Sequence, residues 1–204
     1  MAVVLYFCPK RISMLLQFNG YHGTSLDAAK KIVGANYESS IGDDEWLGNG
    51  VYFFTKGISS KPEEQAKKWA IAQSWDNERR IYKYKEYCVI DSLIEVDEDN
   101  FLDLTKEEGV EVLSYLTECF ENKISKLKRS LKAIDGLLIN LAREEGILPI
   151  DAVKGNFYIK FAKERIKNIT LRTSNCTVCT VFEPTKNITN SNILEIGDIK
   201  DETK

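Results

Sequence analysis

Two short stretches decide the fold of this chain: Tyr21-His22-Gly23-Thr24-Ser25 and Leu47-Gly48-Asn49-Gly50-Val51-Tyr52-Phe53-Phe54. Each combines a strand-like apolar run with a polar or aromatic side chain and a glycine, which lets a ligand approach the backbone. His22 is the only histidine in the sequence. A multi-histidine metal site and a His–His relay are therefore excluded, and any histidine chemistry has to come from His22.

The composition indicates a soluble globular protein. The chain has 204 residues, 43% of them hydrophobic and 29% charged, and a net charge of −3. It is long enough to bury a core and carries no overall basic footprint of the kind that marks nucleic-acid binders. The apolar start, Met1 to Cys8, is too short to span a bilayer, and its basic residues follow the apolar run, the reverse of a secretory signal. We therefore expect a cytoplasmic protein without membrane contact.

The cysteines predict free thiols rather than disulfides or a metal centre. There are five, an odd number, and only Cys176 and Cys179 lie close together in the sequence. A single Cys-x-x-Cys has neither a second pair nor a nearby histidine to complete a zinc site. Because strand-forming residues surround this pair, we expect a buried strand there and no metal.

We expect one α+β domain covering residues 1–204, because strand patterns lie at both ends of the chain with helix patterns between them. Helical periodicity marks a helical insertion at 105–148, and the charged residues 197–204 are expected to form a frayed tail. The other expected strands are 12–23, 50–55, 80–90, 93–96, 168–182 and 193–196, and the other expected helices are 25–34, 61–72 and 156–168.

The two opening stretches resemble the first two signatures of the ADP-ribosyltransferase superfamily, in the branch with a His-Tyr-acidic triad. The residues concerned are Tyr21-His22-Gly23-Thr24 and Gly48-Asn49-Gly50-Val51-Tyr52-Phe53. This branch includes poly(ADP-ribose) polymerases, diphtheria-type toxins and small bacterial toxin or phage-defence transferases. The resemblance covers mainly residues 18–72. It implies a split β-sandwich of two antiparallel sheets with an NAD site between them.

The resemblance also implies roles for individual residues in holding NAD, the co-substrate. His22 would hydrogen-bond the ribose hydroxyls of the adenosine half, and the backbone of Gly23 would pair with the nicotinamide carboxamide. Tyr52 would stack on the nicotinamide ring, which is cationic in NAD and attracted to an aromatic face. Trp69 lies near the place where many members carry a second stacking aromatic residue. Such a site needs no metal to expel nicotinamide.

The third signature of the family is where this sequence departs. Members usually place a glutamate at the start of a late strand, but aligning Cys176–Pro184 puts Thr177 at that position. Glu183 is the nearest acid and stays as the alternative, several residues further along. Thr24 and Ser25 would add hydroxyl contacts near the first signature. Members without the glutamate are generally limited to transferring a single ADP-ribose or are inactive, so the resemblance implies mono-transfer.

The implied function is an NAD-dependent mono-ADP-ribosyltransferase, acting as a bacterial toxin or anti-phage effector. It would release nicotinamide and transfer ADP-ribose to a macromolecular acceptor, protein or nucleic acid, and an antitoxin partner stays open. Two other interpretations remain. The missing acid favours a catalytically inactive module that binds NAD or ADP-ribose. The lysine-rich face of the 105–148 helices favours a helical interaction protein.

Overall fold

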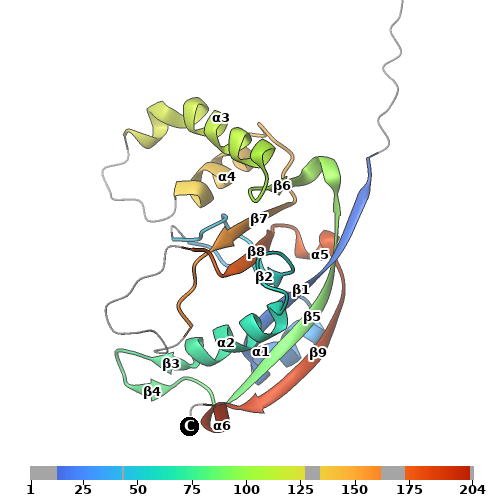
Figure 1. Ribbon diagram of the computed structural model, residues 1–204, viewed down its shortest axis with the longest axis vertical. Coiled ribbons are helices and arrows are strands. Elements are labelled where there is room, and N and C mark those ends of the chain that lie inside the picture. The colour runs from blue at the N-terminus through green and yellow to red at the C-terminus, as the bar shows by residue number, and fades with distance from the viewer. Residues whose placement is uncertain (1–12, 43, 127–133, 162–172, 203–204) are drawn as a thin grey trace, which may run out of the picture.

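The computed structural model describes residues 13–42, 44–126, 134–161 and 173–202, and these form an α+β fold (Figure 1). The strands are β1 (Leu15–Ser25), β2 (Val51–Thr55), β3 (Trp75–Asp76), β4 (Ile81–Tyr82), β5 (Glu86–Asp97), β6 (Phe101–Asp103), β7 (Ala152–Phe157), β8 (Cys176–Val181) and β9 (Ile188–Asp198). The helices are α1 (Leu26–Gly34), α2 (Pro62–Ser74), α3 (Glu107–Ile124), α4 (Ile134–Glu144), α5 (Pro184–Asn187) and α6 (Ile199–Glu202), with a 3-10 turn, η1 (Glu98–Asn100).

Within the described residues, seven strands make one mixed sheet in the order β6-β7-β8-β2-β1-β5-β9. β6 and β7 run parallel, and the other neighbouring strands are antiparallel. β3 and β4 form a small separate ribbon. The expected α+β class is therefore confirmed, but the strands join into a single mixed sheet where the resemblance implies two antiparallel ones.

The contact between β1 and β2 is the narrowest junction in this sheet. β1 pairs with β5 along its whole length, from Leu15 opposite Asp97 to Ser25 opposite Tyr87. It meets β2 at a single register position, Tyr21 opposite Phe54, whereas β2 pairs along its length with β8. The sheet is thereby divided into two groups of strands, β6-β7-β8-β2 and β1-β5-β9, which separate beyond that position.

Alternation along the strands sends side chains into two cores on opposite faces of the sheet. Phe53 of β2 packs in one core together with Ala29 of α1. Phe54, the next residue, packs in the other core together with Ala66 of α2. α1 and α2 thus cover different faces, and the residue order of β2 decides which of its side chains can reach each helix.

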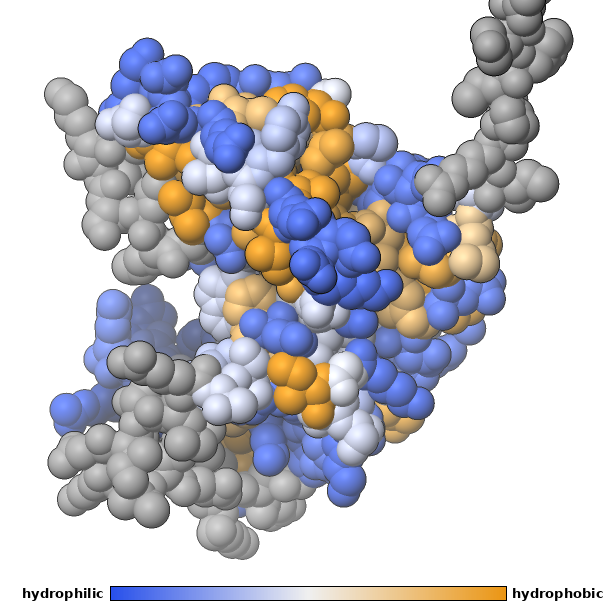
Figure 2. Space-filling view, turned by 45° about the horizontal axis from the view of Figure 1, so that its top comes forward, coloured by the Kyte–Doolittle hydropathy of each residue, from blue (hydrophilic) through white to orange (hydrophobic). Residues whose placement is uncertain are grey.

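The helical section packs against the same face as α2 and lies at one end of the molecule (Figure 1). Leu116 and Phe120 of α3 and Leu138 of α4 are almost fully buried in that core. Figure 2 shows hydrophobic residues on the outer surface of this part, interrupted by polar ones. Of the lysine-rich face, Lys123 is paired with Glu145, and residues 127–133 lie outside the described residues.

Three expectations from the sequence need correction. The helix expected at 156–168 overlaps the end of strand β7, and residues 162–168 lie outside the described residues. β5 runs through the break expected between strands 80–90 and 93–96, whereas the start of the first of these forms the separate strand β4. The expected frayed tail is wrong at its start, because β9 runs to Asp198 and the side chain of Ile199 at the start of α6 is buried.

Candidate functional site

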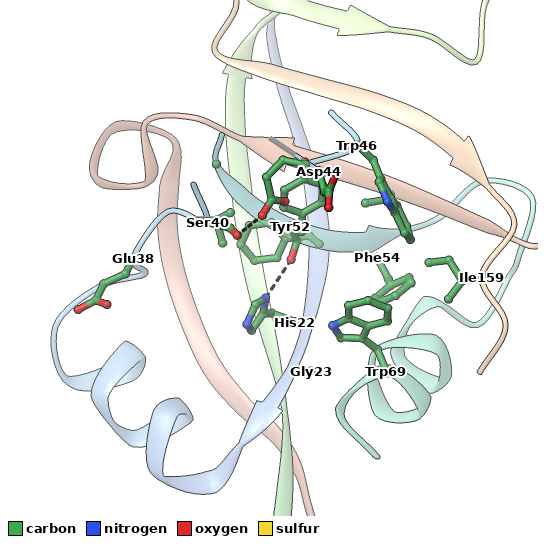
Figure 3. Close-up of a pocket in the computed structure, with 15 residues that line it drawn as sticks. His22, Gly23, Glu38, Ser40, Asp44, Trp46, Tyr52, Phe54, Trp69 and Ile159 are labelled. Carbon is green, nitrogen blue, oxygen red and sulfur yellow. Dashed lines mark hydrogen bonds between the residues drawn. The ribbon is translucent and has the colours of Figure 1, made fainter. Parts of the chain in front are cut away.

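A cavity of about 390 Å³ lies where β1 and β2 separate (Figure 3). This volume is at the lower end of the range for small-molecule sites, roughly 300–1,000 Å³. Its wall is formed by His22, Gly23, Glu38, Ser40, Asp44, Glu45, Trp46, Gly50, Val51, Tyr52, Phe53, Phe54, Trp69, Ile159 and Val178. The structure thus brings together four of the residues singled out from the sequence: His22, Gly23, Tyr52 and Trp69.

His22 is held by the backbone of the second stretch. Its Nδ1 lies 2.9 Å from the carbonyl oxygen of Tyr52. A carbonyl oxygen can only accept a hydrogen bond, so Nδ1 carries the proton and Nε2 is left as an acceptor. The rings of Tyr37 and Phe53 pack edge-on against the imidazole, with centroids 5.3 Å and 5.9 Å away. The ring is therefore fixed in both orientation and tautomer.

The surroundings of His22 keep the imidazole neutral. Burial lowers the pKa of His22 below its usual value of 6.5, and the hydrogen bond to the carbonyl of Tyr52 only partly opposes this. Part of the ring remains accessible from the cavity, but its packed sides disfavour the charged form. A neutral imidazole with a fixed acceptor nitrogen suits a ligand hydroxyl better than a ligand anion.

The lowered pKa of His22 predicts a loss of stability in mild acid. The unfolded chain takes up a proton on His22 near pH 6.5, while the folded chain does not. His22 therefore leaves the free energy of unfolding unchanged above about pH 7 and lowers it as the pH falls below that value. We expect the melting temperature of the wild type to fall more between about pH 7 and pH 5 than that of His22→Asn, whose amide can still donate to the Tyr52 carbonyl. Equal falls in the two proteins would contradict this account.

The phenol of Tyr52 is anchored to the loop before β2. Its hydroxyl donates to the carbonyl of Gly48 at 2.8 Å and accepts from the backbone N–H of Leu47 at 2.9 Å. Burial raises the pKa of Tyr52, and the nearby carboxylate of Glu45 adds to the rise. The hydroxyl therefore stays protonated and is committed to the loop. Tyr52 can contribute its ring face to the cavity but not a base.

An aromatic wall closes the side of the cavity opposite His22 and Tyr52 (Figure 3). Trp69 of α2 lies edge-on to Trp46, with ring centroids 6.3 Å apart, and 6.4 Å from Phe54. Trp46 in turn stacks on Phe157 of β7 at 5.1 Å. Trp46 did not stand out in the sequence, although it immediately precedes the Leu47-Gly48 stretch. Flat apolar surfaces of this kind favour a planar ligand ring.

Gly23 is required by packing as well as by its place in the cavity wall. A Cβ at this position would lie 1.8 Å from the carbonyl oxygen of Ala66 in α2. β1 and α2 therefore approach each other more closely than any side chain at position 23 allows. The same approach brings Trp69, on the next turn of α2, to the cavity.

Four residues singled out from the sequence do not line the cavity. Ser25 caps α1, accepting from the backbone N–H of Ala28, and Thr24 precedes it at the end of β1. The hydroxyl of Thr177 is fully buried, donates to Asn156 and accepts from the backbone of Ile58.

Glu183 lies past the far end of β8, where its carboxylate pairs with Arg143 at 3.2 Å. Neither residue proposed for the third signature therefore reaches the cavity in this structure.

The carboxylates at the cavity come instead from the loop between α1 and β2. Glu38, Asp44 and Glu45 line it, and none of the described lining residues is Lys or Arg. Of the three, Glu38 and Asp44 are exposed and Glu45 is half-buried. The sequence of this polar loop shows no recognisable motif. Only its position directly before the glycine-rich stretch Leu47–Phe54 connects it with the site.

The Cys-x-x-Cys pair belongs to the buried strand β8, as expected. Cys176 and Cys179 are both fully buried free thiols. Cys176 packs in the core that contains α2, and Cys179 in the core that contains α1. The two sulfurs lie on opposite faces of the sheet and cannot share one metal ion. No group of three or more potential metal ligands occurs within the described residues.

Comparison with known proteins adds little to this picture. No protein-family profile matches the chain. An uncharacterized protein of Methanocaldococcus jannaschii, MJ0359, is 29% identical over 124 residues, which cover 59% of this chain and 53% of that protein. The chain thus spans about half the length of this relative. Across the described parts of the chain, no helix has the length and apolar character needed to cross a membrane.

Proposed function

We propose that this protein is an NAD-dependent mono-ADP-ribosyltransferase. The observation that supports the proposal most is the meeting of its two sequence signatures at one cavity. His22 and Tyr52 are 30 residues apart, line the same cavity and are linked by the hydrogen bond from Nδ1 to the Tyr52 carbonyl. In this proposal the division of the sheet between β1 and β2 corresponds to the split sandwich of the family.

The charge of the cavity favours its occupation by the nicotinamide end of NAD. The lining combines aromatic rings with the carboxylates of Glu38, Asp44 and Glu45. Such a lining attracts the cationic nicotinamide ring and repels the pyrophosphate, which would lie outside. The ring would be held between Tyr52 and the aromatic wall, and Nε2 of His22 would accept a hydrogen bond from a ribose hydroxyl.

The proposed reaction is a transfer of a ribosyl group. The bond between the nicotinamide nitrogen and ribose C1′ breaks, and its electron pair leaves with neutral nicotinamide. Positive charge develops on C1′ and the ring oxygen. A lone pair of the acceptor then forms the new bond to C1′, and the acceptor atom loses its proton to solvent. The protein contributes by binding NAD in a desolvated, fixed geometry and by stabilising this charge.

The proposal is tested by incubating the purified protein with NAD labelled in its adenylate half, together with cellular protein, RNA and DNA fractions. We expect free nicotinamide and labelled macromolecules with the wild type, and at least a tenfold smaller yield of both with Tyr52→Ala. Tyr115→Ala removes an exposed tyrosine of α3 and serves as the matched control. Absence of nicotinamide release, or equal labelling by Tyr52→Ala, would overturn the proposal.

A second candidate is a module that binds NAD or ADP-ribose without catalysis. It is favoured by the positions of Thr177 and Glu183, which leave the late strand without an acid at the cavity. Calorimetry that measured tight NAD binding while no nicotinamide appeared would support this candidate. For the transferase, the proposal also includes a macromolecular acceptor, an antitoxin partner and a role as a bacterial toxin or anti-phage effector in the cytoplasm.

A further inference from the structure

The Glu45 side chain is anchored in the cavity wall by Ser40. The hydroxyl of Ser40 donates to its Oε1, and the backbone N–H of Ser40 donates to the carbonyl of Gly50, directly before β2, at 2.9 Å. Glu38 and Asp44 are exposed, whereas Glu45 is half-buried. A carboxylate that is partly removed from water acts more strongly on a charged ligand than a fully hydrated one does.

The backbone around Glu45 is fixed by the helical section. A Cβ on Gly136, in the first turn of α4, would lie 1.9 Å from the carbonyl oxygen of Glu45, so helix and loop are in closest contact there. A few residues on, the side chain of Asn140 accepts from the backbone N–H of Asn49 at 2.8 Å. α4 thus supports the loop that places Glu45 at the cavity.

Glu45 also lies next to the residues that the proposed function assigns to a ribose hydroxyl and to the nicotinamide ring. It lines the cavity together with His22 and Tyr52, and it is close enough to the Tyr52 phenol to raise its pKa. The phenol is already committed to the backbone of Leu47 and Gly48. A carboxylate offers about four lone-pair sites, so Glu45 can accept a hydrogen bond from a ligand in addition to the bond from Ser40 and its contact with the Tyr52 phenol.

We propose that Glu45 is the catalytic carboxylate of the transfer reaction, supplied by the loop before β2 instead of by a late strand. This inference rests on the proposed function. The carboxylate accepts a hydrogen bond from a ribose hydroxyl and faces the positive charge that develops on C1′ and the ring oxygen as nicotinamide leaves. It forms no covalent bond and takes no proton, so the atoms and electrons balance as in the reaction already described.

The test compares Glu45→Gln with Glu183→Gln, which removes the acid nearest the expected third signature. We measure kcat for nicotinamide release at saturating NAD and the Kd for NAD by calorimetry. Losing a preorganised charge lowers kcat by about 10²–10³-fold, so we expect a loss of this size for Glu45→Gln with Kd within about threefold. Glu183→Gln should leave kcat within about twofold, since its ion pair with Arg143 is exposed.

A kcat of Glu45→Gln within about threefold of the wild type, or a large loss with Glu183→Gln instead, would overturn the role of Glu45.

Ser40→Ala keeps the carboxylate but removes its anchor, and we expect kcat to fall by about five- to tenfold with unchanged Kd. An unchanged kcat in Ser40→Ala contradicts the positioning argument even if Glu45→Gln fails to fold. If the wild type itself releases no nicotinamide, the proposed function fails and the role of Glu45 fails with it. An active wild type with an active Glu45→Gln overturns the role of Glu45 alone.

Discussion

Replacing His22 with alanine is expected to weaken NAD binding by about 10- to 100-fold. The substitution removes the Nε2 acceptor assigned to a ribose hydroxyl and also leaves the Tyr52 carbonyl without the hydrogen bond it receives from Nδ1. Losing one partner of a buried hydrogen bond costs about 1–3 kcal/mol, or about 5- to 150-fold in Kd, a span that includes the expected loss. Isothermal titration calorimetry with NAD measures the effect directly.

The control for this prediction is His22→Asn. An asparagine amide can occupy the position of Nδ1 and donate to the Tyr52 carbonyl, but nothing takes the place of Nε2. We expect this variant to melt within a few degrees of the wild type and to bind NAD about as weakly as His22→Ala. Wild-type affinity in His22→Asn would mean that His22 only supports β2 and makes no contact with the ligand.

Replacing Gly23 with alanine is expected to destabilise the fold by about 3 kcal/mol. The new methyl group would overlap the carbonyl oxygen of Ala66, a backbone atom of α2 that cannot rotate away, so β1 and α2 have to separate. Overpacking of this kind typically costs about 1–3 kcal/mol or more, and for a chain of this size 3 kcal/mol lowers the melting temperature by about 6–12 °C. Thermal unfolding followed by circular dichroism measures the shift.

Gly34→Ala is the matched control for the substitution at Gly23. Gly34 ends α1, and a Cβ there would meet no atom within 4 Å. We expect it to raise stability by about 0.4–1 kcal/mol, through a smaller loss of backbone entropy on folding. A Gly23→Ala protein as stable as Gly34→Ala would show that α2 does not approach β1 as closely as described.

The sequence predicted best those elements whose pattern is local. α1 follows from its N-cap Ser25 and α2 from Pro62 in its first turn, and both helices lie where they are expected. Strand β2 follows from its run of aromatic and β-branched residues. The structure also brings His22 and Tyr52 to one cavity, as the resemblance implies, while membership of that family stays a proposal.

The sequence predicted least those features that depend on contacts between distant segments. β7 contains Gly155 and Asn156, which are poor strand formers, and is a strand because β6 and β8 pair with it on either side. Glu45 and Trp46 sit in a loop without periodicity, and their place at the cavity depends on α4 and β7. No local pattern in the sequence connects these segments.

The most direct test of the central claim is a crystal structure determined from crystals grown with saturating NAD. The account predicts a nicotinamide ring in the cavity between Tyr52 and Trp69, with Nε2 of His22 within hydrogen-bonding distance of a ribose hydroxyl. A dinucleotide bound elsewhere on the protein, or a cavity that stays empty at saturating NAD, would contradict it.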